Sequence, residues 1–249
     1  MRAIAKTSIQ FSLINIPVSL YKGTESKSIS FKQVHRDCGG FVKQPKECEK
    51  CGDRISNDEI AKGYIYDKDK VLVLEKEEVM DDTSVTNIPI AQFTTLDQID
   101  PRYMNGDVYY LSPQQGGESL FALLLEALNK QGRVAVCRYA HKSKERIGVI
   151  RPLAKTLCLI GMRYTDELRT GPAPLDITID KENLAFMDKL VSKHTKKFKP
   201  SDYENEQSER IRQVIEGKLA GKATKKKLVT TIPKEVSIKD TLEAALKEK

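Results

Sequence analysis

The sequence predicts a mixed β/α fold that is mainly antiparallel β, with helices concentrated towards the C-terminal end. Short segments with alternating apolar and polar residues recur through the first two thirds of the chain. Only one clear helical stripe interrupts them, so they lack the repeated helical crossovers that a parallel sheet requires. After Gly171-Pro172-Ala173-Pro174 the pattern changes to helix. These observations favour a β-barrel or a β-sandwich over a βαβ arrangement.

The first two strands are expected within residues 4–21. Ile9 and Phe11 alternate with polar residues, as Leu13 does, and the alternation resumes at Ile16. Pro17 has no N–H to donate to a ladder, so we expect it at a sheet edge or a bend. Later strands are predicted at residues 64–66, 71–74, 85–93, 108–111, 133–139, 147–151 and 156–164.

Two connections in this part of the chain are also predicted. The polar residues 67–70 between two strand patterns indicate a hairpin turn. A second polar loop is expected at residues 141–146. The clearest helix of the first half spans residues 118–130, with Gly132 just past its end as a stop signal. Residues 75–80 could form a shorter helix.

Helices dominate the chain after residue 175. Asp180 is placed to cap a helix that runs to about residue 194. Ser201 and Glu204 match a capping box for a second helix that ends near Gly221. We expect an inward-facing apolar stripe on the first helix and a similar stripe on the second, formed by Leu184, Met187, Leu190 and Val191 and by Ile211, Val214, Ile215 and Leu219 respectively.

The last residues, 222–249, divide into a basic linker and a short amphipathic stretch. The linker is 222–227, and the stretch begins at Ser237. Such a short helix is unstable alone, so it needs a partner, which makes it a docking candidate. A frayed terminus is the alternative.

Residues 28–54 carry the most distinctive chemistry of the chain. They open with an expected strand at 28–32 and contain two short pairs of potential metal ligands. Cys-x2-Cys followed by Gly is a turn that lets two thiolates reach one tetrahedral metal, and a His-x2-Cys pair precedes it. Zinc prefers four such nitrogen and sulfur donors. We therefore predict a structural zinc site formed by His35, Cys38, Cys48 and Cys51.

Alternatives to this zinc site remain open. Asp37 or Asp53 could replace His35 as the fourth ligand. The cysteines could also be small buried residues or a redox pair. A redox Cys-x-x-Cys normally begins a helix, whereas Gly52 and Asp53 interrupt the chain directly after this one.

The composition favours a polyanionic partner and a reducing compartment. The net charge is +7 and the pI is about 9.0, which suits nucleic acid or an anionic membrane surface. Five cysteines, three of them clustered, are typical of reduced, metal-binding thiols rather than of a disulfide framework. No apolar run approaches the length of a signal sequence or a membrane span, so a cytoplasmic location is expected.

Several short motifs occur in a fixed order from the first residues to about Leu219. They are Arg2-Ala3-Ile4, Ser8-Ile9-Gln10-Phe11-Ser12-Leu13-Ile14-Asn15-Ile16-Pro17-Val18, Gly63-Tyr64, Leu96-Asp97-Gln98-Ile99-Asp100-Pro101, Tyr109-Tyr110-Leu111, Gly116-Gly117, Gly132-Arg133-Val134-Ala135 and Met162-Arg163-Tyr164 with Asp166-Glu167. Together they resemble the bacterial Ku family. Because the likeness is distributed along nearly the whole chain, it is more specific than any single motif.

The resemblance implies a central β-barrel and a homodimer that forms a ring around duplex DNA ends. In that family the ring recruits the ATP-dependent DNA ligase D for non-homologous end joining, which implies a nucleoid-associated protein with no catalytic activity of its own. An arch over the DNA grows from the segment that matches residues 28–54. The implied domains are a barrel core at 1–175 with a bridge arm at about 28–62, a C-terminal helical arm at 176–221, and a linker with a short helix at 222–249. A zinc knuckle in the arch belongs to only part of the family.

A protein that holds any broken DNA end must contact phosphates and sugars rather than bases. The predicted contacts are Lys32, Arg36, Lys43, Lys46, Lys50 and Arg54 on the arm, and Arg138, Lys142, Lys144 and Arg146 at a second basic hairpin. Each is by itself an ordinary surface charge. The prediction is therefore collective, with roughly 6–10 phosphate contacts and a steep salt dependence of affinity.

Three other functions compete with this hypothesis. A hydrolase could use Cys137 or Cys158 with His141 or His194, but both cysteines lie in apolar strand patterns typical of buried, inert thiols. A zinc-ribbon protein that binds RNA or the ribosome would fit the charge and the cysteine pairs. A scaffold for other proteins could use the terminal helices and should not bind DNA.

Overall fold

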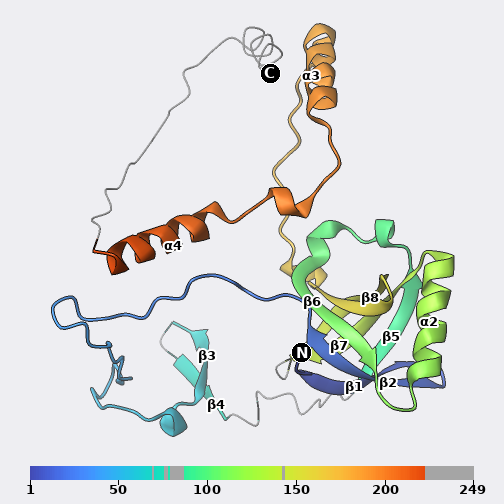
Figure 1. Ribbon diagram of the computed structural model, residues 1–249. Helices are drawn as coiled ribbons and strands as arrows, with labels where there is room; N and C mark the ends of the chain where they lie inside the picture. The colour runs from blue at the N-terminus through green and yellow to red at the C-terminus, as the bar shows by residue number, and fades with distance from the viewer. Residues whose placement is uncertain (69, 76–77, 79–86, 142–143, 222–249) are drawn as a thin grey trace. The chain divides into compact units, whose positions relative to one another are not determined.

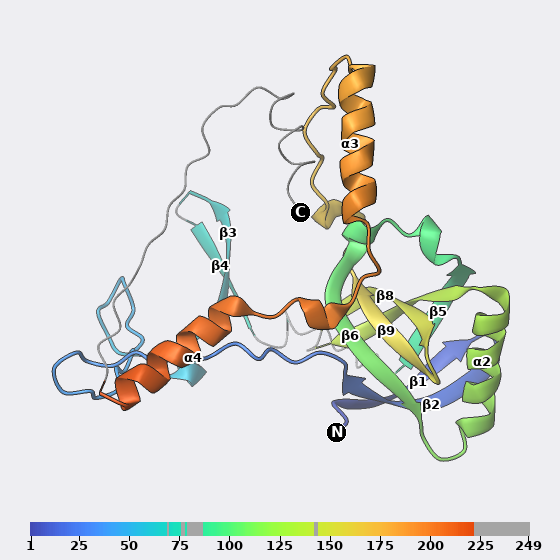
Figure 2. The same ribbon diagram turned by 45° about the horizontal axis from the view of Figure 1, so that its top comes forward.

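Seven strands close into a barrel in the computed structural model, which describes residues 1–68, 70–75, 78, 87–141 and 144–221 (Figures 1 and 2). Neighbouring strands are antiparallel, except that β1 and β5 pair in parallel and complete the closure. The mainly antiparallel β-barrel predicted from the sequence is confirmed. Around the barrel the strands follow the order β1 (Ala5–Phe11), β2 (Ile14–Lys22), β6 (Met104–Pro113), β9 (Thr156–Met162), β8 (Lys144–Leu153), β7 (Val134–His141) and β5 (Asn87–Thr94).

The β1–β2 hairpin shows how the alternating pattern becomes a barrel wall. Ile9 lies opposite Ile16 in the register, and neither side chain is exposed to solvent. Each such side chain contributes about 1.5–3 kcal/mol through burial. Ser12 has a positive φ of 50° and turns the chain between the strands. Leu13, which we expected to continue the strand, lies in this turn and is fully exposed.

Pro17 lies inside β2 rather than at a sheet edge, because a closed barrel has no edge. It pairs with Ser8 on β1, and the β2–β6 register begins one residue later, at Val18. The carbonyl oxygen of Pro17 accepts a hydrogen bond from the amide of Gln114 beyond the end of β6. The nitrogen of Pro17 faces the same side as its carbonyl group, beyond the last residue pair of the β2–β6 ladder. No ladder hydrogen bond from this nitrogen is required there, so the strand accommodates the proline.

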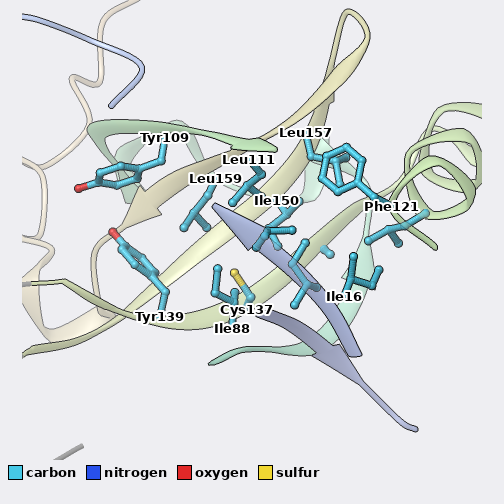
Figure 3. Packing of buried hydrophobic residues seen from close by; sticks show 14 of the residues in the cluster. Ile16, Ile88, Tyr109, Leu111, Phe121, Cys137, Tyr139, Ile150, Leu157 and Leu159 are labelled. Carbon is cyan, nitrogen blue, oxygen red and sulfur yellow. The ribbon is translucent and has the colours of Figure 1, made fainter. Parts of the chain in front are cut away.

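Helix α2 (Glu118–Gln131) supplies part of the barrel core. Its Phe121, Leu124 and Leu128 belong to the same buried cluster as the strand residues. Figure 3 shows Phe121 at one end of this cluster, and Tyr109 and Tyr139 at the other end. The helix ends as predicted at Gly132, which adopts the left-handed conformation (φ 61°) that glycine tolerates best.

The strands around the second basic hairpin are longer than predicted. β7 continues to His141 and β8 begins at Lys144, so the polar loop expected over residues 141–146 is largely strand. Backbone pairing of the two strands extends into this region, with His141 opposite Lys144 and Ala140 opposite Glu145. Residues 142 and 143 lie outside the described part of the chain.

The segment at residues 23–61, between β2 and the next hairpin of the chain, contains no buried residue and little regular structure. The strand expected at residues 28–32 is wrong, because these residues are irregular and belong to none of the described strands. One short 3-10 helix, η1 (Asn57–Glu59), is present. The predicted hairpin is confirmed as β3 (Lys62–Asp67) and β4 (Lys70–Leu74), whose apolar side chains are mostly exposed in the described chain.

Residues 28–31 and the described residues from Gly171 onwards form a unit separate from the remainder of residues 1–170. In this second unit, helix α3 (Lys181–His194) is capped as predicted, because the Asp180 carboxylate accepts a hydrogen bond from the amide of Asn183 at 3.0 Å. The expected inward face is wrong for the described chain. Leu184, Met187 and Val191 are 47–60% exposed, since no described element covers them.

The predicted capping box of the next helix is also wrong. Helix α4 (Glu206–Leu219) begins after Asn205, whose side chain accepts a hydrogen bond from the amide of Ser208 at 3.0 Å. Ser201 instead lies in the 3-10 turn η5 (Pro200–Asp202), which the proline initiates. The helix stops near Gly221, as expected, and its apolar stripe is half-buried or exposed.

Some expectations fall on residues that the structure does not describe. These are most of the short helix at 75–80, the first two residues of the strand at 85–93, and the linker and amphipathic stretch at 222–249. In the described part of the chain, no helix has the length and apolarity needed to cross a membrane.

Candidate nucleic-acid interface

Two turns with the same backbone hydrogen bonds occur in the arm, at residues 35–40 and 48–53; we call them the first and second knuckles. In each, the amide of the first residue donates to the carbonyl oxygen of the sixth, at 2.8 and 2.9 Å. The amide of the fifth residue donates to the carbonyl oxygen of the first, at 2.9 and 2.8 Å. The fifth residues, Gly39 and Gly52, have φ of +70° and +74°. Glycine favours this left-handed backbone, so each turn depends on the glycine that follows its ligand pair.

The residues outside the knuckles repeat as well. An isolated β-bridge flanks each turn, Val34 with Phe41 and Glu47 with Arg54. A further hydrogen bond closes each loop, from the amide of residue 42 to the oxygen of residue 33 (3.1 Å) and from residue 55 to residue 46 (3.0 Å). The same local fold is therefore built twice within a segment that has no hydrophobic core.

Each knuckle brings two candidate metal ligands together. In the first, the Nδ1 atom of His35 lies 3.1 Å from the Sγ atom of Cys38. Typical zinc–nitrogen and zinc–sulfur bond lengths in a tetrahedral site place two such donors about 3.5 Å apart. The other ring nitrogen of His35 lies 3.7 Å from the carboxylate of Asp37, the position of a group that orients a ligating histidine. This arrangement favours Asp37 as a partner of His35 over Asp37 as a competing ligand.

In the second knuckle, the thiols of Cys48 and Cys51 are close enough to influence each other's pKa. Hydrogen bonds from the backbone amides of Cys51 and Lys50 lower the pKa of Cys48 below its ordinary value. A hydrogen bond from the backbone of Asp53 acts to lower the pKa of Cys51, but the adjacent Cys48 thiol helps to raise it overall. The turn therefore favours one thiolate, which is the form that binds metal.

The two knuckles remain separate pairs. Among the described residues, no three metal-binding side chains come together, so the structure does not assemble His35, Cys38, Cys48 and Cys51 into one group. The spacing of the His35–Cys38 pair is close to that of two ligands in one tetrahedral site. The four-ligand zinc site therefore stays a prediction.

All six basic residues predicted on the arm are exposed to solvent, namely Lys32, Arg36, Lys43, Lys46, Lys50 and Arg54. Two have partners that were not predicted. The Nζ atom of Lys32 lies 5.0 Å from the centre of the Phe41 ring, and Lys46 donates to the side-chain oxygen of Asn57 at 2.9 Å. Phe41 is 71% exposed, so this cation–π pair presents both a charge and an aromatic face to solvent.

The second basic hairpin is more nearly neutral than the sequence suggested. Arg138 pairs with Glu145 on the neighbouring strand, and Arg146 pairs with Asp107 on β6, each at 3.3 Å. Lys144 is exposed and lines a polar hollow of about 280 Å³ together with Glu145 and Arg146. Lys142 lies outside the described residues. The carboxylates reduce the positive charge that this hairpin offers to DNA.

The two cysteines proposed for a competing hydrolase are buried in the barrel wall. Burial raises the pKa of Cys137 to about 12 and also raises that of Cys158. The Cys137 thiol donates to the carbonyl oxygen of Gly148 at 3.5 Å. Neither thiol is placed to act as a nucleophile, because the thiolate is the reactive form and both sites disfavour it.

Comparison with known proteins agrees with this architecture. The family model described as "Ku70/Ku80 beta-barrel domain" matches residues 10–204. A non-homologous end joining protein Ku from Archaeoglobus fulgidus is 34% identical over 256 residues, covering 99% of this chain and 98% of the relative. The Ku proteins of Heliobacterium modesticaldum and Bacillus subtilis are each 31% identical, over 255 and 231 residues. The first alignment covers 100% of this chain and 92% of the relative, and the second covers 90% and 74%.

The matched region contains the complete barrel except for the first residues of β1, and it also contains both knuckles and helix α3. The family suggested by the order of the sequence motifs is therefore confirmed by two kinds of comparison. With a closed seven-strand barrel and matches of this extent, the chain belongs to the Ku family of β-barrel proteins.

Proposed function

We propose that this chain binds the ends of double-stranded DNA in non-homologous end joining, as a ring-shaped homodimer that acts without catalysis and recruits the ATP-dependent DNA ligase D. Its membership of a family whose relatives carry the name "non-homologous end joining protein Ku" is the observation that carries this proposal. A nucleoid-associated, cytoplasmic location follows from the same function.

The arm is the best candidate for the DNA-contacting surface. Arg36, Lys43, Lys50 and Arg54 are exposed, and none forms an ion pair within the described part of the chain. Guanidinium and ammonium groups in this state can contact phosphates without displacing an internal partner. Arg138 and Arg146 would first have to leave their carboxylates. The arm cations therefore supply most of the non-sequence-specific affinity.

A second copy of the chain would explain why so much apolar surface is exposed. The β3–β4 hairpin leaves Tyr64, Ile65 and Leu72 more than half exposed, and a two-stranded hairpin is only marginally stable in water. The 14-residue helix α3 has no buried residue in the described chain, although an isolated helix of this length is also marginal. Both features are typical of segments that become stable on association.

Zinc would connect the two knuckles. We propose that His35, Cys38, Cys48 and Cys51 hold one structural ion, which would draw the two halves of the arm together and exclude a catalytic water. Cys48→Ser and Cys51→Ser should each abolish the metal content, whereas Cys158→Ala, a control outside the knuckles, should retain one zinc per chain. Elemental analysis of the purified proteins measures this result. A metal-free wild-type protein prepared with zinc in the medium would contradict the site.

The zinc-ribbon alternative, an RNA- or ribosome-binding protein, is favoured by the repeated knuckle and is separated by competition. A labelled duplex bound to the chain should be displaced by unlabelled linear duplex at a lower concentration than by structured RNA. Stronger displacement by the RNA would support the alternative.

The ligase proposal is checked in the same system, since joining of linear DNA by ligase D should increase when the chain is added.

Competition between two DNA topologies tests the ring. A ring admits DNA only through an end, so an unlabelled linear duplex should displace a labelled linear duplex, and a sealed circle of the same sequence should compete poorly. The mass of the complex, measured in the same buffer, should correspond to two copies of the chain. Equal competition by the circle, or a single copy on the DNA, would contradict the proposal.

A further inference from the structure

A strongly basic segment begins in the last turns of helix α3 and continues beyond it, and it was not among the predicted DNA-binding residues. Between residues 189 and 201 the sequence contains five lysines and no aspartate or glutamate, and Asp202 follows directly. Three of the lysines, Lys196, Lys197 and Lys199, are exposed and form no ion pair with any described residue. This density of positive charge is much higher than that of the chain as a whole, whose net charge is +7 over 249 residues. The segment is thus a local site for a polyanion.

Two aromatic rings lie next to each other in the same segment. The ring centres of Phe198 and Tyr203 are 5.5 Å apart, with an angle of 31° between the ring planes. The turn η5 sets this distance, because the amide of Tyr203 donates to the carbonyl oxygen of Pro200 at 3.2 Å. The side chains are 70% and 67% exposed, so the pair offers flat apolar surface to solvent. Exposed paired aromatics among lysines form a stacking platform for bases.

We propose that residues 196–203 bind the single-stranded overhang of a DNA end, with the lysines on its phosphates and the Phe198–Tyr203 pair stacked on its unpaired bases. This activity goes beyond the proposed duplex binding, which uses the backbone alone. The two rings cannot stack on bases within a duplex, because the faces of those bases are already stacked on each other inside the helix. An unpaired strand presents both negative charge and free base faces.

The charge of the segment favours this occupant over a second copy of the chain. The chain is itself basic, with a pI of about 9.0, so another copy would bring like charge towards these lysines. The aromatic pair is held within a span of six residues, by a turn in the same unit. The proposed site therefore requires no other part of the molecule to form.

Fluorescence anisotropy with three labelled probes tests the proposal: a blunt duplex, the same duplex with a 3′ thymidine tail, and the isolated thymidine strand. The full-length chain should bind the tailed duplex more tightly than the blunt one, by roughly 5-fold or more if at least one base stacks. The double variant Phe198→Ala/Tyr203→Ala should lose this difference and retain its affinity for the blunt duplex. The conservative pair Phe198→Tyr/Tyr203→Phe keeps both rings and should keep the preference.

Charge variants complete the experiment. Lys196→Gln/Lys197→Gln/Lys199→Gln should weaken binding of the tailed duplex and the single strand more than Lys155→Gln, an exposed lysine in the β8–β9 turn. Equal wild-type affinity for blunt and tailed duplexes would overturn the proposal, as would a preference that survives the alanine pair. A change of molecular mass in the alanine pair would also overturn it, since the rings would then hold two copies together. Failure of duplex binding would appear separately, as weak wild-type binding to the blunt probe.

Discussion

The barrel and the arm achieve their structures by different means. In the barrel, side chains distant in sequence are removed from water together, as Ile9, Leu111 and Leu159 show with no exposed surface. In residues 21–68 of the arm and its flanks, no residue is buried. The arm instead depends on short-range hydrogen bonds and on two glycines with positive φ. Burial fixes the scaffold, whereas local turn chemistry fixes the part that we propose to contact DNA.

Because of this difference, we expect the barrel to determine the stability of the chain and the arm to determine its binding of DNA. A basic surface that must fit any DNA end benefits from exposed cations, which the barrel interior cannot hold without a large desolvation cost. An exposed arm contributes little stability of its own, so the barrel must fold without its help. Substitutions in the two regions should therefore affect different measurements.

The largest expected effect on the free energy of unfolding comes from removing a core side chain. Ile150→Ala removes a completely buried side chain from β8 and should lower the free energy of unfolding by about 2–5 kcal/mol. Ile60→Ala, at a position that is 41% exposed in the arm, should lower it by less than about 1 kcal/mol. Urea denaturation of both variants measures the contrast. Similar losses would show that the arm is part of the folding core.

A smaller effect is expected from overpacking the barrel wall. A methyl group at Gly148 would lie 2.9 Å from the carbonyl oxygen of Ile160 and from a methyl of Leu159. Gly148→Ala should therefore destabilise the chain by about 1–3 kcal/mol. Gly171→Ala is the matched control, because nothing lies within 4 Å of its added methyl. Thermal unfolding distinguishes them, and an unchanged Gly148→Ala midpoint would mean that the wall is loosely packed.

The smallest expected change concerns a polar group at one end of the core. The Tyr139 hydroxyl is buried and has no hydrogen-bond partner among the described residues, and burial raises its pKa to about 12. Tyr139→Phe removes that group and keeps the ring, so stability should stay the same or rise by about 1 kcal/mol. Tyr109→Phe serves as a comparison on the neighbouring ring. A clear loss of stability in Tyr139→Phe would indicate a hydrogen bond through a buried water.

The barrel was largely predictable because strands with one buried face alternate apolar and polar residues along the sequence. Alternation located the strands, and Gly132 located the end of α2. The strand expected at 28–32 is wrong because a strand also requires pairing with a neighbouring strand, which alternation does not indicate, and residues 28–32 are irregular. The inward face of α3 failed for a related reason, since the direction of an apolar stripe depends on what covers it. The capping box at Ser201 failed because Pro200 begins a separate turn and Asn205 supplies the cap instead.

The candidate site was predictable only where its chemistry is local. The spacing of Cys48, Cys51 and the following glycine indicated a knuckle, and the structure contains that turn twice. The pairing of Arg146 with Asp107 could not be predicted, because it joins β8 to β6 across 39 residues. The Phe198–Tyr203 pair was not predicted, although Phe198 lies between Lys197 and Lys199 in the sequence. Aromatic residues next to clustered lysines are the signal that indicates such a pair.

The salt dependence of DNA affinity tests the central claim, that exposed cations of the arm hold the duplex by its phosphates. The variant Arg36→Gln/Lys43→Gln/Lys50→Gln/Arg54→Gln is compared with the wild type and with Arg138→Gln/Arg146→Gln, using a blunt linear duplex. We predict that the slope of log affinity against log salt falls by roughly 0.9 for each phosphate contact removed from the arm. The Arg138/Arg146 variant should change it less, and the unfolding midpoint of the arm variant should stay the same. An arm variant with the wild-type slope would contradict the account.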